Sequence, residues 1–277
     1  MSPTPIPNRE WTPVRGLTPL TEAEGRELAE RFPINPHYVI AYGGLRWGVD
    51  RAFVAGSFHD PAAIIVQHRH SPGEPEFFGR DAEAAWRILS RIPGWFCVNG
   101  ETDEMNRLAP LLTREIPHEP RWLGDLFYTL EGPPRPHSDP RVRLLGIEDI
   151  PLLQTKEPSP WAAGYRTYEE LLTYGAVAAA IVDGKVVAEA VCTAANRRYA
   201  DIGVHTVEPF RRRGFSSAAV YLVARELKAR GLVPIWSTGS DNLASQRVAA
   251  KVGFQPLDRG EYVVFDGLKA AGGYRPA

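Results

Sequence analysis

The chain has 277 residues, of which 44% are hydrophobic and 23% charged, and its formal net charge is −1 at pH 7. This length suggests two domains with ordinary buried cores. A net charge so close to zero gives no basic field for nucleic acid, and two cysteines are too few for a disulfide framework or a CxxC metal site. The N-terminus is interrupted by prolines where a signal peptide needs an apolar core, and no apolar run approaches the ~20 residues that span a bilayer. We expect a cytoplasmic protein with no metal, membrane or nucleic-acid partner.

The N-terminal part predicts an α/β unit. Helical periodicity and caps indicate helices over 21–32, 81–92 and 102–112. Thr21 and Glu24 have the spacing of a capping box at the start of the first helix. β-rich runs indicate strands over 52–58, 62–68, 94–100 and 126–130.

A proline-rich stretch then separates this unit from the rest. The sequence "EGPPRPHSDPRVR", residues 131–143, has four prolines and a glycine between two strand-like segments. Proline lacks an N–H donor and holds the residue before it extended, which favours a semi-stiff linker. We therefore predict an N-terminal domain over 1–132, a linker over 133–140 and a C-terminal domain over 141–277.

The C-terminal part predicts the order strand, two helices, three strands, helix, strand, helix, strand. Asp183-Gly184 between two β-rich runs indicates a hairpin with a type I′ turn. The fold class is α/β in the layered α+β sense. The segments 94–112 and 233–252 both read as strand, glycine, acidic cap and helix, which suggests a weak internal repeat.

One loop in the C-terminal part is suited to binding an anion. The strand that ends at Val207 is followed by "EPFRRRGFSS", residues 208–217, and then by a helix. The first turn of a helix has unpaired N–H groups and a partial positive charge, and a glycine lets a ligand approach the backbone. The loop is not a Walker loop, because no GK[ST] follows, and GxGxxG is absent.

These residues resemble the pyrophosphate loop of the GNAT superfamily of acyl-CoA N-acyltransferases. The family pattern [RQ]-x-x-G-x-[GA] reads here as "RRRGFS", residues 211–216, with serine for the last small residue. The resemblance covers roughly 141–265, and the family ending "N-x-x-S…K-x-GF" has its register at Asn242, Ser245, Lys251, Gly253 and Phe254. It implies a mixed, mostly antiparallel sheet flanked by helices. By analogy with relatives that pair two halves, the N-terminal domain is then a degenerate GNAT-like half.

The resemblance also implies which groups hold acetyl-CoA. Backbone N–H groups near Thr206 or Val207 would polarise the thioester carbonyl. Asn242 would bond the pantetheine arm, and the loop N–H groups and arginines would hold the phosphates. The implied cofactor-binding loop and helix residues are Arg211, Arg212, Arg213, Gly214, Phe215, Ser216, Ser217, Asn242 and Ser245.

The catalytic groups are less well defined. Many family members have a tyrosine four residues before the glycine of "GF" as the acid that protonates the thiolate, but that position is Ala249. Tyr262 is a candidate acid, although a tyrosine on a final strand also fits simple packing. His205 and Asp201 on the strand before the loop are candidate bases, since a histidine titrates near neutral pH. Two alternatives fit the sequence equally well: His205 is a core histidine with satisfied hydrogen bonds, and Asp201 marks the start of a strand.

The acceptor pocket has two further candidates. Tyr165 and Tyr168 precede the hairpin, where this family often shapes the acceptor pocket, and the alternative is an amphipathic helix face. The sequence as a whole predicts an N-acetyltransferase that moves an acetyl group from acetyl-CoA to a primary amine of a small molecule or peptide, by direct transfer in a ternary complex. A longer acyl-CoA is an alternative donor. A non-catalytic acyl-CoA-binding regulatory or structural protein is the alternative function, and nucleic-acid binding through "RRRG" ranks last. We assign the N-terminal domain to substrate recognition, packing or homodimer contacts.

Overall fold

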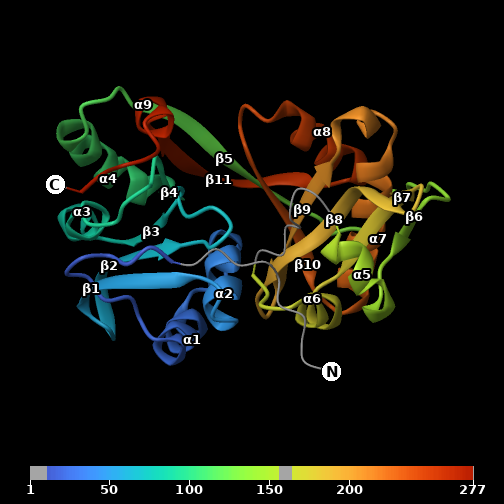
Figure 1. The fold of residues 1–277 in the computed structure, drawn as a ribbon, viewed down its shortest axis with the longest axis horizontal. Helices are drawn as coiled ribbons and strands as arrows, with labels where there is room; N and C mark the ends of the chain where they lie inside the picture. Colours follow the sequence, from blue (N-terminus) through green and yellow to red (C-terminus); the bar gives the residue numbers. More distant parts are fainter. Residues whose placement is uncertain (1–10, 156–163, 277) are drawn as a thin grey trace.

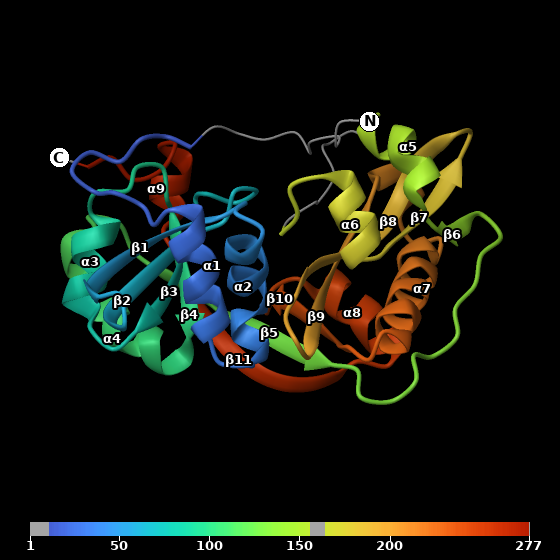
Figure 2. The ribbon, with the colours of Figure 1, turned by 90° about the horizontal axis from the view of Figure 1, so that it is seen from below.

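The computed structural model describes residues 11–155 and 164–276. Within these ranges the strands form one eleven-stranded sheet in the order β1-β2-β3-β4-β11-β5-β10-β9-β8-β7-β6. Figure 1 shows a half built from the N-terminal elements and a half built from the C-terminal elements, side by side, and Figure 2 shows the same division from below. The first ten residues, on which much of the signal-peptide expectation rests, lie outside the described residues.

The N-terminal half contains the predicted helices and strands together with two elements that the sequence did not reveal, α2 and β3. The capping box of Thr21 and Glu24 is confirmed at the start of α1. The elements are α1 Glu22–Arg31, α2 Val39–Arg46, β1 Arg51–Ser57, β2 Asp60–Gln67, β3 Glu76–Gly79, α3 Ala82–Leu89, β4 Cys97–Glu101, α4 Thr102–Glu115 and β5 Arg121–Thr129.

The C-terminal half has the predicted element order, with one more helix, α9, at its end. The predicted hairpin turn is confirmed by the positive φ angles of Asp183 (50°) and Gly184 (71°). The elements are β6 Val142–Leu144, α5 Ile150–Gln154, α6 Tyr168–Tyr174, β7 Val177–Val182, β8 Lys185–Ala195, β9 Tyr199–Thr206, α7 Phe215–Ala229, β10 Val233–Gly239, α8 Leu243–Val252, β11 Gln255–Val264 and α9 Asp266–Ala270. Only β3–β4 and β9–β10 pair in parallel among the described strands, so the sheet is mixed and mostly antiparallel, as expected.

The two halves exchange their last strands. Strand β11 from the C-terminal part pairs with β4 and β5, and β5 from the N-terminal part pairs with β11 and β10. The two units β4–α4–β5 and β10–α8–β11 are those in which the sequence showed a weak repeat, and they interleave at the centre of the sheet (Figure 1). The segment between β5 and β6 is free of helix and strand, but the predicted domain boundaries there do not separate the cores. Phe265 and Leu268, which lie after β11, belong to the core cluster of the N-terminal half.

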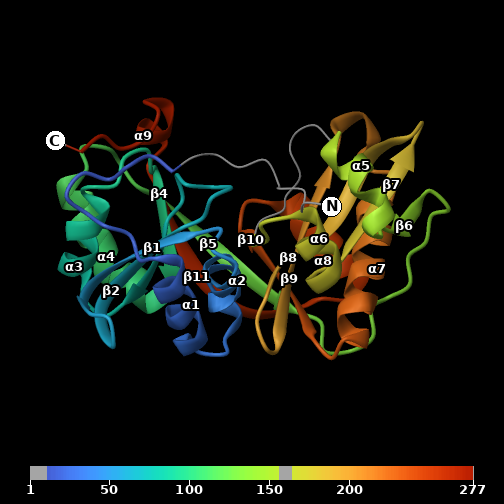
Figure 3. The same ribbon diagram turned by 60° about the horizontal axis from the view of Figure 1, so that its bottom comes forward.

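Helix α2 joins the halves on one face of the sheet. It packs on β8 and β9 of the C-terminal half (Figure 3). A Cβ on Gly43 would lie 2.7 Å from the Cβ of Ala194, so only glycine permits this approach. Val39 is fully buried in a cluster with Ala194 and Ile235. The N-terminal half therefore packs directly against the strand that ends at the candidate loop. Among the described residues, no helix combines the length and the apolar character needed to cross a bilayer.

Candidate active site

A cavity of about 1100 Å³ lies between the two halves. Its wall from the C-terminal half consists of β9, the loop before α7, β10 and the start of α8. Its wall from the N-terminal half consists of residues on or near α2, β2, β3, β4 and β5, and β11 adds residues from the centre of the sheet. The cavity thus brings the predicted loop together with a wall of N-terminal residues that the sequence did not connect to it.

The C-terminal wall opens where two parallel strands separate. The pairing of β9 with β10 covers only Tyr199–Asp201 and Val233–Ile235. Beyond this point both strands line the cavity, with residues 202–206 on one side and 236–239 on the other. A strand that leaves its neighbour exposes every second N–H group to the gap. The separation therefore supplies backbone donors to whatever occupies the cavity.

The two residues expected to polarise the thioester differ in their availability. The N–H of Val207 donates to the carbonyl of Val187 at 2.9 Å, which directs it toward β8. Because N–H groups alternate along a strand, the N–H of Thr206 points to the other edge, toward the cavity. The expectation for Val207 is therefore wrong, and Thr206 retains its candidate role.

The loop before α7 has the geometry of an anion site. Gly214 has φ 84° and ψ −6°, and α7 begins at the next residue with no side-chain cap on its first N–H groups. A Cβ built on Gly214 would meet no atom within 4 Å, so the space in front of this residue is open. Arg212 also has a positive φ of 63°. The loop therefore turns its backbone toward open space at the positive end of a 15-residue helix.

The side chains around the loop hold it in this shape. Arg211 donates from Nε to the carbonyl of Thr206 at 3.3 Å. Arg213 donates to the carbonyl of Pro209 at 3.1 Å and lies 5.1 Å from the centre of the Phe210 ring. All three arginines of the loop are exposed. Arg211 and Arg213 stabilise the loop, and all three arginines add positive charge at the mouth of the cavity.

Hydroxyl and amide groups fasten the loop to β9 and α8 to β10. Ser216 and Thr206 share a hydrogen bond between their hydroxyls at 2.7 Å. Asn242 accepts the N–H of Ser245 at 3.1 Å as the cap of α8, which leaves its amide donors for a ligand. Ser245 accepts the indole N–H of Trp236 at 3.0 Å.

The remaining loop positions, and the position of the missing acid, are buried. Phe215 is 1% exposed and packs under the loop, so its N–H rather than its ring is the group that can serve a ligand. Ser217 is also buried and lines the cavity. Ala249 is fully buried in the core cluster with Trp236, so position 249 offers no proton donor.

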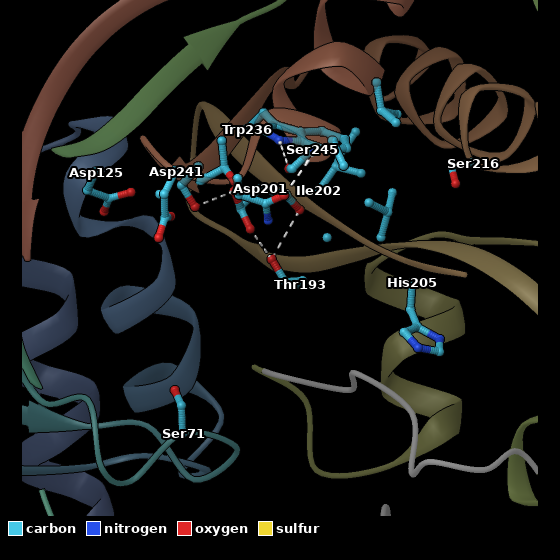
Figure 4. A pocket seen from close by; sticks show the side chains of 18 of the residues that line it. Ser71, Asp125, Thr193, Asp201, Ile202, His205, Ser216, Trp236, Asp241 and Ser245 are labelled. Carbon is cyan, nitrogen blue, oxygen red and sulfur yellow. Dashed lines mark hydrogen bonds between the residues drawn. The ribbon is translucent and has the colours of Figure 1, made fainter. Parts of the chain in front are cut away.

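Asp201 lies at the point where β9 and β10 separate. Its side chain is buried, accepts a hydrogen bond from the hydroxyl of Thr193 and lies 3.4 Å from the hydroxyl of Ser237 (Figure 4). Burial raises the pKa of Asp201 to about 6, against the hydrogen bonds that favour its charged form. A carboxyl with this pKa can take up a proton near neutral pH, which keeps Asp201 a candidate base.

His205 lies on the same face of β9 as Asp201 but farther along the strand. It lines the cavity and sits opposite Glu189 of β8 in the register. Four residues along a strand correspond to ~13 Å, and Figure 4 shows His205 well apart from the group around Asp201. The two candidate bases therefore cannot act on the same reacting atom.

Tyr262 belongs to the N-terminal side of the cavity. It lies on β11 opposite Asn99 of β4 and Leu123 of β5, and it lines the cavity. Burial raises the pKa of its hydroxyl well above the usual value, and the charge of Asp125 adds to this. The hydroxyl stays protonated at neutral pH, so Tyr262 can donate but cannot act as a base.

The N-terminal wall also contains a buried acid–base cluster that sequence reasoning missed. His68 hydrogen bonds through Nδ1 to Asp50 at 2.7 Å and through Nε2 to Glu76 at 3.3 Å. Burial alone would lower the pKa of His68, but the two carboxylates raise it to about 10. The imidazole is therefore charged and already paired. No short-range pattern could reveal this cluster, because its members come from three separate segments.

The acceptor-pocket expectation for Tyr165 and Tyr168 is wrong. Both side chains are buried in a core cluster and neither lines the cavity. The hydroxyl of Tyr165 lies 3.6 Å from the sulfur of Cys192, and that of Tyr168 donates to the carbonyl of Leu153 at 3.2 Å. Trp47 from the N-terminal half lies against Tyr165, with ring centres 5.8 Å apart. This contact between the halves buries a helix face that was expected to line the acceptor pocket.

A parallel pair of strands separates in front of an uncapped helix within a mixed sheet, which is the arrangement that the sequence resemblance implies. Residues 147–265 match the family model described as GNAT acetyltransferase. The match covers 147–265 of the 277 residues, so this part of the chain is similar to GNAT acetyltransferases.

Solved structures repeat the whole two-half arrangement. A GCN5-related N-acetyltransferase-like protein from Streptococcus suis has 18% identity and a TM-score of 0.66, with 87% of this chain and 98% of that chain covered. A GNAT-family acetyltransferase from Colwellia psychrerythraea has 15% identity and a TM-score of 0.56, with coverage of 90% and 99%. A tandem GNAT protein from the clavulanic acid biosynthesis pathway has 14% identity and a TM-score of 0.50, with coverage of 90% and 97%. At these identities the likeness concerns the fold. No curated protein matches the chain.

Proposed function

We propose that this protein is an N-acetyltransferase that moves an acetyl group from acetyl-CoA directly to an amine. The observation that carries the proposal is the open space at Gly214, in front of the uncapped start of α7, at the mouth of the same cavity in which β9 and β10 separate. A pyrophosphate in the open space and a pantetheine arm between the strands would fill this arrangement. The acceptor is a small-molecule or peptide amine, and we place the reaction in the cytoplasm.

Each group has a part in the proposed reaction. The loop N–H groups and the arginines hold the phosphates, and the amide of Asn242 contacts the pantetheine arm. An N–H group on the part of β9 that has left β10, between Asp201 and Thr206, donates to the carbonyl oxygen of the thioester, where negative charge develops. The amine nitrogen attacks the carbonyl carbon, the C–S bond breaks, and the thiolate takes up a proton. A thiol has a pKa near 8.5, so the thiolate leaves without strong acid catalysis.

A non-catalytic acyl-CoA-binding protein is the second candidate, because position 249 has no proton donor. The two are separated by release of free thiol from acetyl-CoA with and without a panel of amines, together with acetyl-CoA binding by calorimetry. The enzyme gives amine-dependent thiol release, and the binding protein gives binding alone. Absence of acetyl-CoA binding would contradict both.

A further inference from the structure

Asp125 is a buried carboxyl at the junction of the halves. It lies on β5, is 7% exposed and lines the cavity. Its Oδ1 has no hydrogen-bond partner among the described residues. Buried polar atoms in folded proteins nearly always have partners, so an exception that borders a cavity indicates a ligand group that would supply the missing hydrogen bond.

The two strands that flank Asp125 place no side chain of their own beside it. Its register neighbours are Gly239 on β10 and Gly260 on β11, one on each side. Residues directly opposite in antiparallel strands present side chains on the same face, and glycine presents none. The groups that approach from elsewhere are Asp241, with Oδ1 2.9 Å from the position of a Cβ on Gly239, and His37 on the side of Gly260. Figure 4 shows Asp125 on the side of the Asp201 group that lies away from His205.

The ionisable groups around Asp125 are mostly acidic. Burial raises the pKa of Asp125 to about 8, the charges of Glu76, Asp201 and Glu261 add to this, and a hydrogen bond from Tyr262 opposes it. The imidazole of His37 approaches this row, with its Nδ1 3.6 Å from the position of a Cβ on Gly260.

The basic groups on this wall are largely engaged elsewhere. His37 contacts Asp258 at 3.0 Å through Nε2, and His68 is held by Asp50 and Glu76. Arg121 makes a bidentate pair with Asp266 at 2.8 and 3.1 Å. Lys269 lies 4.8 Å from the ring centre of Phe96, and its charge lowers the pKa of Glu74. The wall is therefore suited to a cation and has little to offer an anion.

We propose that Asp125 binds the ammonium group of the acceptor and takes its proton, and that the acceptor is an amine with no carboxylate on the adjacent carbon. This inference rests on the proposed function. The ammonium proton passes to the Asp125 carboxylate and the neutral amine attacks the thioester. The second nitrogen proton leaves after the C–N bond forms and balances the departing thiolate. A carboxylate next to the amine would face Glu76 and Asp201, so an α-amino acid is a poor acceptor.

The test compares Asp125→Asn with the wild type. Asparagine keeps the shape of the side chain and removes the carboxylate. Asp103→Asn, at an exposed position of α4 that does not line the cavity, makes the same chemical change as a control. The acceptors are tyramine against tyrosine and phenethylamine against phenylalanine, since each pair differs by one carboxylate.

We expect Asp125→Asn to lower kcat/KM for the amines by about 100-fold or more, the range for loss of a general base, with an unchanged Kd for acetyl-CoA. The acidic limb of the wild-type pH profile should vanish in this variant, and Asp103→Asn should match the wild type. Equal activity and equal pH profiles of Asp125→Asn and wild type would overturn the role of Asp125. Preference for tyrosine over tyramine would overturn the acceptor class.

A binding measurement keeps this result separate from the proposed function. Tyramine binding to the protein saturated with CoA is followed by calorimetry, which needs no turnover. If no amine supports turnover but Asp125→Asn weakens tyramine binding about tenfold or more, consistent with loss of a buried charged hydrogen bond, the transferase proposal fails and the amine site stands. If tyramine binds both proteins equally or binds neither, the amine site fails.

Discussion

Gly214→Val tests the candidate phosphate site directly, and the chain contains its own control. Gly214 and Gly231 lie just before and just after α7, with φ of 84° and 80°, and a Cβ at either position meets no protein atom within 4 Å. Valine at either position therefore costs the backbone a similar ~1–2 kcal/mol for a left-handed conformation. Gly214 lines the cavity, and Gly231 does not.

The difference between the two variants isolates the ligand. At Gly214 the new side chain projects into the space assigned to the pyrophosphate and removes one or two hydrogen bonds to a charged group, each worth about 1.5–3 kcal/mol. A loss near 3 kcal/mol corresponds to about a 100-fold higher Kd. Calorimetric titration with acetyl-CoA measures the Kd, and denaturant unfolding measures the stability. We expect equal losses of stability but a weaker Kd for Gly214→Val alone. Equal Kd values for the two variants would remove this loop from the binding site.

Three further expectations concern the cavity and the halves. Acetyl-CoA should bind with a stoichiometry of one per chain, because the corresponding helix of the N-terminal half, α3, has its first turn capped by the carboxylate of Asp81, which accepts the N–H of Ala84 at 2.9 Å; calorimetry giving two sites would contradict this. Burial raises the pKa of Asp125 from 3.8 to about 8, so this group stabilises the fold at low pH and that contribution is lost as the pH rises through 8. The free energy of unfolding of Asp125→Asn should therefore rise relative to that of the wild type as the pH of the assay increases from about 5 to about 9. A difference that does not change with pH would refute the burial argument. Tyr262→Phe removes the hydrogen bond that lowers the pKa of Asp125, so the acidic limb of the amine pH profile should move to higher pH; a bell-shaped profile whose alkaline limb is lost in this variant would instead identify Tyr262 as the general acid.

The sequence predicted the parts of the structure that depend on local signals. The anion loop was predictable because a glycine between a strand and a helix leaves a recognisable pattern over a few residues, and the hairpin at Asp183-Gly184 was predictable for the same reason. Helix α2 was missed because its sequence "VIAYGGLR" contains two glycines and no side-chain cap at its start. Its stability comes from close packing on Ala194, a residue about 150 positions away, a separation that no helix-propensity pattern can detect.

The candidate site also has one part that local sequence signals predicted and one part that they did not. The phosphate end lies in one segment and could be predicted. The opposite wall depends on β5 lying between β10 and β11, so Asp125 reads in the sequence as an ordinary strand residue in "WLGDLF". Tyr165 and Tyr168 were assigned to the wrong environment because Trp47, which covers Tyr165, comes from the other half of the chain.

The exchange of β5 and β11 limits how the protein can move during turnover. Many two-part enzymes admit and release ligands by opening one part away from the other on a hinge. Here four strands at the centre, β4, β11, β5 and β10, are joined edge to edge by backbone hydrogen bonds that cross between the halves three times. Opening on a hinge would have to break a row of these hydrogen bonds, so we expect no such opening between the halves. Acceptor and product must therefore pass through the mouth of the cavity, and product escape should be controlled by the loops around that mouth.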